Sequence, residues 1–275
     1  DCLYINVFTP QVGVFSYIPH DSILRLFQLP SEDNNVSLSV MFFIHGGAFK
    51  DGTSMDSASD LIIENDIILV TINYRLGPLG FLSTQDEIVP GNNGLKDQLL
   101  ALQWAHNNIN LFGGDPEKVT IFGQSAGSAS CAYHLLNQQS QGLFRGAILQ
   151  SGSSLSPWAY QRNAREVAFA TAALINDTFS TNNDSAELLN FLRTVDANVL
   201  TAAAQKMQPS PEYTEVYQGL FWAPVIEVKN PDAFITKKMY GLLQANNIVA
   251  VPLLIGMTSE ESLGLRDITS KIVDV

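Results

Sequence analysis

Residues 119–127 read Val-Thr-Ile-Phe-Gly-Gln-Ser-Ala-Gly, and this segment constrains the fold more than any other part of the chain. A β-branched strand runs directly into a Gly-x-Ser-x-Gly turn, and residues 128–136 after it have the composition of a helix. Glycines two positions on either side of Ser125 permit a bend in which a Cβ atom would clash. The helix start offers Ser125 free N–H groups and a favourable dipole. We predict that Ser125 is a catalytic nucleophile; the alternative is a glycine-rich turn that arose by chance.

A second turn of small residues follows the apolar run 40–44 and reads His-Gly-Gly-Ala-Phe, residues 45–49. Small residues let neighbouring backbone N–H groups point toward one spot, as an oxyanion hole requires. The residue after the nucleophile, Ala126, can add one more N–H from the start of the helix. We predict that the N–H groups of Gly47, Ala48 and Ala126 form this hole. The alternative is a simple turn that ends a strand.

Short apolar runs alternate with longer helical patterns along the chain, which is typical of an α/β fold with a parallel sheet. The runs are nearly continuous, so we expect strands that are covered on both faces. The predicted strands are residues 3–8, 40–45, 67–74, 119–123, 146–151 and 251–256, and the predicted helices are 94–112, 128–136, 164–176 and 185–194. Residues 201–217 contain two prolines and little periodicity, so we expect an irregular excursion over the active-site side. No linker divides the chain.

The composition excludes several classes of protein. Hydrophobic residues make up 46% of the 275, enough for a sizeable core, but no apolar run reaches the roughly 18 residues of a membrane span. A net charge of −12 argues against nucleic acid and anionic membranes as partners. The two cysteines, Cys2 and Cys131, are too few for a disulfide framework, and no Cys/His cluster has the spacing of a metal site. We predict no metal, nucleotide or redox cofactor, and we expect Cys131 to be a buried small side chain.

With both turns in place, the chain resembles the type-B carboxylesterase/cholinesterase family of α/β-hydrolases, and most of all the insect carboxylesterases. The other segments that carry the resemblance are residues 1–6, 73–83, 91–98, 112–116 and 150–152, in the family's order. The resemblance implies an α/β-hydrolase fold, with a central, mostly parallel sheet and helices on both faces. It also implies a secreted serine carboxylesterase that hydrolyses small-molecule carboxylic esters through an acyl-enzyme.

The resemblance also implies an acidic partner for the serine. The family's acid follows a strand that ends in glycine, and alignment on Gly256 places Glu261 at that position, with Glu260 beside it. The acid orients a histidine and stabilises its imidazolium form. In this fold the histidine follows the acid in the chain, and no histidine follows Glu261. We therefore expect residues 1–275 to be a partial domain that lacks its N-terminal and C-terminal portions, with the base outside it, and to be inactive alone.

None of the four histidines fits the role of the base. His134 lies nine residues after Ser125, which places it on the opposite side of the same helix. His45 belongs to the small-residue turn, where we expect its ring to brace the backbone. His106 falls within the helix predicted at 94–112, and His20 lies in a stretch without a clear pattern.

Other residues take their expected roles from the resemblance. Arg75 and Asp97 match an ion pair of the family, and Ser151 matches a serine near the acid. Gln124 stands before the nucleophile, where cholinesterases carry glutamate, and residues 224–235 lack the paired aromatics of acetylcholine-selective members. Both differences argue against choline esters and favour broad, apolar ester substrates.

Three alternatives stay open. The form Gly-Gln-Ser-Ala-Gly also occurs in many juvenile hormone esterases, so that specificity is a candidate. A binding protein of the neuroligin type is a second candidate, although such relatives usually lose the serine. The third is a truncated, inactive family member.

Two further features concern modification of the chain. Sequons for N-glycosylation stand at Asn35, Asn176 and Asn183, about as many as chance predicts. The resemblance implies that Cys2 is unpaired, because its family partner lies upstream.

Overall fold

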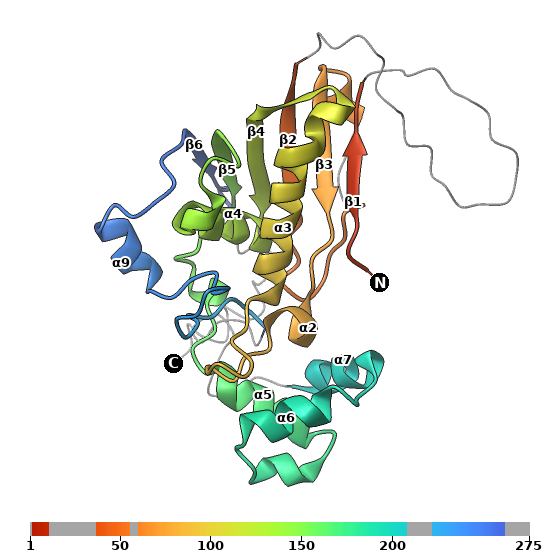
Figure 1. Ribbon diagram of the computed structural model, residues 1–275, viewed down its shortest axis with the longest axis vertical. Coiled ribbons are helices and arrows are strands. Elements are labelled where there is room, and N and C mark those ends of the chain that lie inside the picture. Colours follow the sequence, from red (N-terminus) through yellow and green to blue (C-terminus); the bar gives the residue numbers. More distant parts are fainter. Residues whose placement is uncertain (1, 11–36, 56–59, 208–221, 262–275) are drawn as a thin grey trace, which may run out of the picture.

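The computed structural model describes residues 2–10, 37–55, 60–207 and 222–261. A six-stranded sheet with the order β1-β3-β2-β4-β5-β6 forms its centre (Figure 1). The strands are β1 (Ile5–Phe8), β2 (Leu38–Ile44), β3 (Ile67–Ile72), β4 (Gly114–Gln124), β5 (Gly146–Gln150) and β6 (Leu253–Gly256). β1 runs antiparallel to β3, and every other neighbouring pair is parallel. The predicted strands therefore form one mostly parallel sheet.

Helices occupy most of the connections between the strands. They are α1 (Asp60–Ile63), α2 (Gly77–Phe81), α3 (Asn93–Asn108), α4 (Ala126–Leu136), α5 (Ala164–Ala173), α6 (Ser185–Leu192), α7 (Ala197–Lys206) and α9 (Met239–Gln244). Short 3₁₀ turns lie at η1 (Ile109–Phe112), η2 (Gln138–Ser140), η3 (Pro157–Ala159) and η4 (Asp177–Ser180). Helices α3 and α4 pack against the middle of the sheet, whereas α5, α6 and α7 gather at one end of the molecule (Figure 1).

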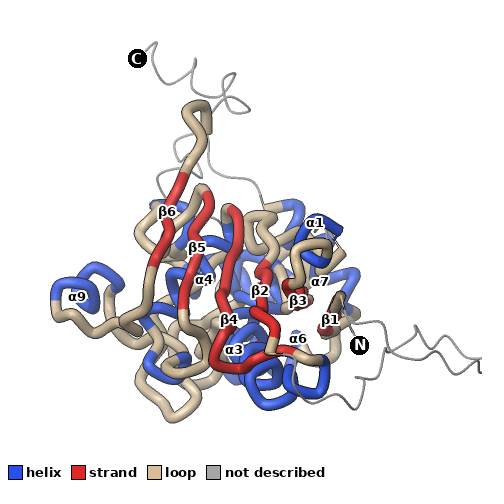
Figure 2. The backbone as a smooth tube through the Cα atoms, turned by 90° about the horizontal axis from the view of Figure 1, so that it is seen from above, coloured by secondary structure: helices blue, strands red, loops and turns tan. Residues whose placement is uncertain are grey.

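The sheet is strongly twisted. In the view of Figure 2, β1 and β3 are seen nearly end-on, whereas β5 and β6 lie across the view. Parallel strands end at the same edge, so the turns that follow β2, β4, β5 and β6 meet there. The register aligns Ile44 with Gly123, Gln124 with Gln150, and Gln150 with Gly256. This edge is where open α/β sheets bind their ligands.

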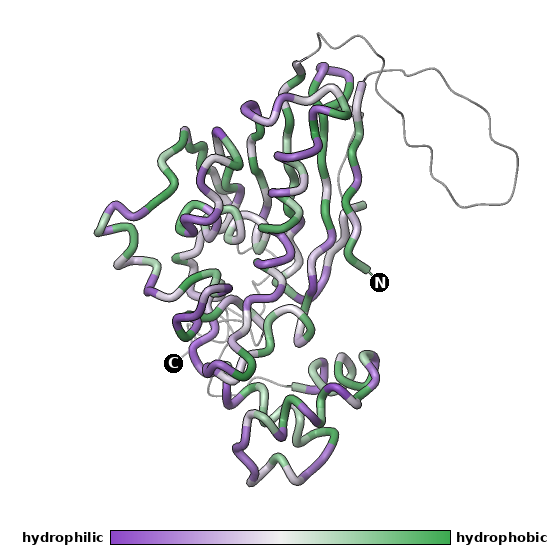
Figure 3. Tube along the Cα trace, in the orientation of Figure 1, coloured by the Kyte–Doolittle hydropathy of each residue, from purple (hydrophilic) through white to green (hydrophobic). Residues whose placement is uncertain are grey.

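Coverage of the sheet differs from strand to strand. Hydrophobic residues follow the strands (Figure 3), and residues 68–72 of β3 are all buried, as expected for a strand covered on both faces. The expectation is wrong for β6 in the described part of the chain, where Leu254 and Ile255 are 63% and 62% exposed. Residues 253–256 pair with β5 along one side only.

The helical segments were predicted less completely than the strands. The excursion expected over residues 201–217 begins instead as helix α7, which buries Leu200, Ala203 and Ala204. The side chain of Asp196 accepts the N–H of Asn198 at 2.9 Å and so caps this helix. The helix expected over 94–112 ends at Asn108 and continues as η1, and α2 and α9 were not predicted.

Candidate active site

Ser125 occupies a strained turn between β4 and α4. Its backbone has φ 56° and ψ −121°, a region that residues with a side chain rarely enter. The turn is held by a 2.9 Å hydrogen bond from the Ser125 N–H to the Gln150 carbonyl. A Cβ atom on Gly127 would lie 2.0 Å from the carbonyl oxygen of Ile44, which explains the glycine requirement. Among the described residues, the Ser125 hydroxyl has no hydrogen-bond partner.

The loop after β2 lies directly against this serine. A Cβ atom on Gly46 would be 3.3 Å from the Cβ of Ser125, so the two backbones approach closely. Gly47 has φ 106°, and its carbonyl accepts the N–H groups of Lys50 at 3.0 Å and Asp51 at 2.9 Å. Ala48 follows in the left-handed region with φ 53°. The loop is therefore a tight, preformed turn.

Three backbone N–H groups around Ser125 have no acceptor in the described part of the chain. They belong to Gly47 and Ala48 in the loop and to Ala126 at the start of α4. Ala126 is fully buried, and buried N–H groups in proteins are nearly always paired, whereas Gly47 and Ala48 are half-buried. Unpaired donors beside a nucleophile are free to meet an acceptor. A developing oxyanion is an acceptor of this kind.

The ring of His45 supports the loop. Its Nδ1 lies 2.8 Å from the Gly46 carbonyl oxygen, and the ring stacks on Tyr74 with centroids 4.4 Å apart. The Tyr74 hydroxyl donates to the His45 carbonyl at 2.9 Å. Burial raises the pKa of Tyr74 far above its usual value, so the hydroxyl keeps its proton as a donor.

Glu261 meets Ser151 at the same edge of the sheet. Its Oε1 accepts the Ser151 hydroxyl at 2.5 Å and the Thr258 N–H at 2.6 Å. Ser151 has φ 56° and donates its own N–H to the Gly256 carbonyl at 2.8 Å. The Ser151 hydrogen bond, followed by that of Thr258, lowers the pKa of Glu261 and keeps the carboxylate ionised. Glu261 is exposed.

Neither Ser125 nor Glu261 has a hydrogen bond to a histidine in the described part of the chain. His134 is fully buried, with Nδ1 2.9 Å from the Ser140 hydroxyl and Nε2 3.3 Å from Oε1 of Gln98. Burial lowers its pKa to about 3, so it packs as a neutral ring. His106 is half-buried on α3, and His20 lies outside the described residues.

Arg75 and Asp97 form a bidentate ion pair. Nη2 of Arg75 lies 2.7 Å from Oδ1 of Asp97, and Nε lies 2.7 Å from Oδ2. The Asp97 side chain is 8% exposed and that of Arg75 is 38% exposed, so the pair is only partly shielded from water. The pair ties the loop after β3 to the N-terminal half of α3.

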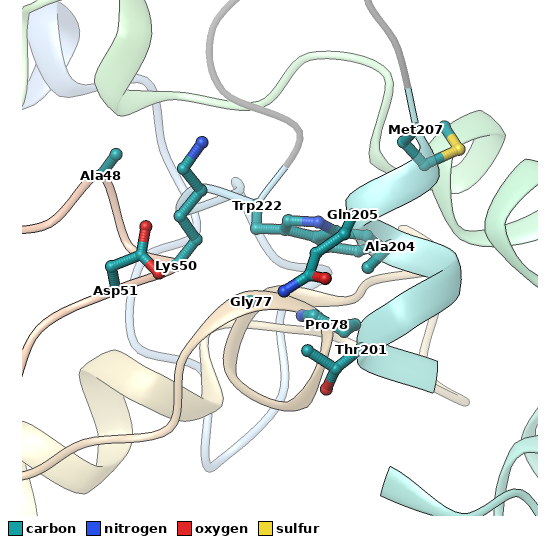
Figure 4. Close-up of a pocket in the computed structure, with 10 residues that line it drawn as sticks. All are labelled: Ala48, Lys50, Asp51, Gly77, Pro78, Thr201, Ala204, Gln205, Met207 and Trp222. Carbon is teal, nitrogen blue, oxygen red and sulfur yellow. The ribbon is translucent and has the colours of Figure 1, made fainter. Parts of the chain in front are cut away.

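A cavity of about 230 Å³ opens beside the loop that carries Ala48 (Figure 4). Its apolar wall comes from α7 and the segment after residue 221, and its polar side chains include Lys50 and Asp51. The lining residues are Ala48, Lys50, Asp51, Gly77, Pro78, Thr201, Ala204, Gln205, Met207 and Trp222. Of these residues only Ala48 was predicted to belong to the site, and Lys50 lies two positions after it in the same loop.

A buried carboxylate was also missed. Oε2 of Glu227 accepts the Asn92 amide at 2.9 Å and the Phe234 N–H at 2.7 Å. Nζ of Lys96 lies 2.6 Å from Oε1, as an ion pair whose angles are not those of a hydrogen bond. This network fixes residues 225–235 against the start of α3. Its signal would have been a charged residue within the apolar run Pro-Val-Ile-Glu-Val.

Within the described ranges, no helix is long and apolar enough to span a bilayer, and no group of three or more His, Cys, Asp or Glu could hold a metal ion. Cys131 is buried and free, as predicted. Cys2 is exposed and free.

The chain is similar to known esterases in sequence and in structure. The sequence profile of the carboxylesterase family matches residues 1–273. A carboxylic ester hydrolase of Bombus ignitus is 40% identical over 94% of this chain and 45% of the relative. A juvenile hormone esterase of Tribolium castaneum is 37% identical over 96% of this chain and 42% of the relative. The solved structure of a PNB esterase matches with a TM-score of 0.72 and 34% identity over 94% of this chain and 49% of the other. The chain thus spans less than half the length of these relatives.

Proposed function

This chain belongs to the carboxylesterase family, and on that premise we propose that the protein is a serine carboxylesterase with Ser125 as its nucleophile. One observation carries the proposal. Ser125 is held in a strained turn, beside three N–H groups, of Gly47, Ala48 and Ala126, that have no acceptor among the described residues. Backbone strain and preorganised, unpaired N–H donors are both typical of active sites.

The reaction begins when Oγ of Ser125 attacks the carbonyl carbon of an ester. A histidine base takes the hydroxyl proton while the C–O bond forms, and the carbonyl oxygen becomes an oxyanion. The N–H groups of Gly47, Ala48 and Ala126 donate to this oxyanion, and each donor is worth roughly 3 kcal/mol in comparable enzymes. The base returns the proton to the leaving alcohol, and water then hydrolyses the acyl-enzyme.

Glu261 is the acid that orients the histidine in this mechanism. The Ser151 hydrogen bond holds the Glu261 carboxylate ionised, as the acid of a triad must be. The base is a histidine outside these 275 residues, which form one part of an α/β-hydrolase domain. The satisfied, buried environment of His134 supports this assignment. Residues 1–275 alone are then inactive.

The substrates are small carboxylic esters with apolar groups. Gln124 is exposed next to the nucleophile and brings no carboxylate for a cationic substrate. Similarity to a juvenile hormone esterase makes that specificity the second candidate.

The protein follows the secretory pathway, and exposed Asn176 and Asn183 carry glycans, whereas Asn35 lies outside the described residues. Enzymatic deglycosylation of the native protein tests this; unchanged electrophoretic mobility would contradict it.

The decisive test uses the full-length protein and p-nitrophenyl butyrate. Ser125→Ala should lower kcat by a factor of about 10⁴ or more, because the nucleophile is lost. Ser130→Ala removes a hydroxyl from the same helix, one that accepts a hydrogen bond from the Gln98 amide, and the variant should keep most of the activity. Turnover by Ser125→Ala at the wild-type rate would overturn the proposal.

A further inference from the structure

Lys50 projects into the cavity beside the candidate active site. It stands two residues beyond Ala48, whose N–H is one of the three proposed oxyanion donors, and both residues line the cavity. In Figure 4 the Lys50 side chain extends between Ala48 and the ring of Trp222. Ala48 is the residue that this cavity shares with the proposed oxyanion hole, since Ser125, Gly47 and Ala126 do not line it. A ligand whose carbonyl meets the Ala48 N–H and whose chain enters the cavity would have its next few atoms near this lysine.

The charge of Lys50 is not neutralised within the described ranges of the chain. Lys50 is exposed and takes part in no ion pair there. Asp51 also lines the cavity, but its carboxylate lies on the side of Ala48 and the Lys50 ammonium points away from it (Figure 4). The cavity thus holds an ammonium group that is free to bind an anion.

The opposite wall of the cavity is apolar. It is formed by Ala204, Met207 and Trp222, with the amide of Gln205 at its edge. An apolar wall facing one cation suits a ligand with a short hydrocarbon chain and a terminal anion. A cationic ligand would be repelled by the exposed ammonium, and a purely apolar ligand would gain nothing from its charge.

We propose that, among esters with short apolar chains, Lys50 makes this site favour those that carry a carboxylate a few bonds from the ester carbonyl. The inference rests on the proposed function, because it requires the ester carbonyl at the N–H of Ala48. A lysine side chain reaches about 6 Å from its Cα on a flexible four-carbon stem, so the carboxylate should lie three or four bonds from the carbonyl carbon. Monoesters of short dicarboxylic acids have this form.

The test compares two esters of equal chain length in the full-length protein. Mono-p-nitrophenyl glutarate carries the carboxylate, and p-nitrophenyl pentanoate has a methyl group in its place. The readout is the ratio of kcat/KM for the charged ester to kcat/KM for the neutral ester. Lys50→Gln should lower this ratio about threefold to fivefold, as expected for one exposed charge pair, and Lys50→Glu should lower it about tenfold or more.

Two further variants separate this role from a general effect of charge or structure. Asp51→Asn removes the neighbouring anion and should raise the ratio. Lys206→Gln removes the same charge from the end of α7 at an exposed residue that does not line the cavity, and it should change the ratio by less than about twofold. An unchanged ratio in Lys50→Gln, or an equal fall in Lys206→Gln, would overturn the inference.

A binding measurement keeps the inference separate from the proposed function. If the wild type hydrolyses neither ester, the esterase proposal fails, and glutarate is titrated while tryptophan fluorescence is followed. The part of the fluorescence change that is lost in Trp222→Phe comes from the tryptophan that lines the cavity. Weaker glutarate binding in Lys50→Gln than in Lys206→Gln would support the anion site, whereas equal affinities, or no binding by the wild type, would overturn it.

Discussion

Ser151 donates a 2.5 Å hydrogen bond to Glu261 and so joins the end of β5 to the loop after β6. This contact is the largest cause of the lowered pKa of Glu261. In Ser151→Ala the pKa of Glu261 should rise toward its usual value, since the ionised form loses its best donor. The acidic limb of the pH profile of kcat/KM in the full-length protein should move to higher pH. An acidic limb in the same place would show that Glu261 does not control it.

The two neighbouring carboxylates should differ sharply in their importance for turnover. Glu261→Gln should lower kcat by about 10³-fold to 10⁴-fold, because an amide cannot stabilise an imidazolium and favours the wrong tautomer. Glu260→Gln removes the same charge one residue earlier and should change kcat by less than about threefold. Steady-state kinetics on p-nitrophenyl butyrate decide between them. Comparable losses in both variants would contradict the assignment.

The Arg75–Asp97 pair should contribute to stability, but less than a fully buried pair. Because the Arg75 side chain is 38% exposed, we expect Asp97→Asn to lower the free energy of unfolding by about 1–3 kcal/mol rather than by the larger cost of a buried pair. Urea denaturation measures the change. Lys118→Ala breaks a pair with Asp115 in which the cation is equally exposed but the carboxylate is 21% rather than 8% exposed, so it should cost less stability. Equal effects in the two variants would count against a role for partial burial.

The positions of several candidate site residues could be predicted from the sequence because they depend on local backbone geometry. A sharp turn after a strand needs small residues, so Ser125 and the loop 45–49 were visible as patterns. Chain order in the sheet then brings the ends of β2, β4, β5 and β6 together, and the family resemblance supplied Glu261 and Ser151. The structure places these residues at one edge of the sheet.

The features that were missed depend on contacts between distant segments. The cavity joins Lys50 to residues 201–207 and to Trp222, which lie more than 150 positions away in the chain, and no local pattern records that contact. Helix α7 was missed because the prolines at 209 and 211 obscured the alanine-rich stretch before them. The partner of Glu227 could not be predicted either, since Lys96 comes from another part of the chain.

His134 should make the protein less stable in acid. Its pKa falls from the usual 6.5 to about 3 on folding, so between these values the unfolded chain binds a proton that the folded chain does not. Stability from the neutral ring is complete above pH 6.5 and declines as the pH falls, by up to about 1.4 kcal/mol per pH unit. In His134→Gln, which cannot titrate, the free energy of unfolding should fall less steeply between pH 6 and pH 4. Parallel curves for the two proteins would refute this.

Substitution of two adjacent residues in the loop after β2 should have very different effects on activity, large at Gly47 and small at Ala48. A Cβ atom on Gly47 would lie 2.1 Å from the Asp51 carbonyl oxygen, and Gly47 has φ 106°, so Gly47→Ala must displace the loop and its N–H groups. We expect kcat to fall by about 10²-fold to 10³-fold, as when an oxyanion donor is lost, together with a lower melting temperature. Ala48→Gly keeps the N–H and relieves the strain of φ 53°, so it should retain most of the activity and change stability by less than about 1 kcal/mol. Kinetics and thermal unfolding of both variants make the comparison. If Gly47→Ala were as active as Ala48→Gly, the loop geometry would not govern catalysis.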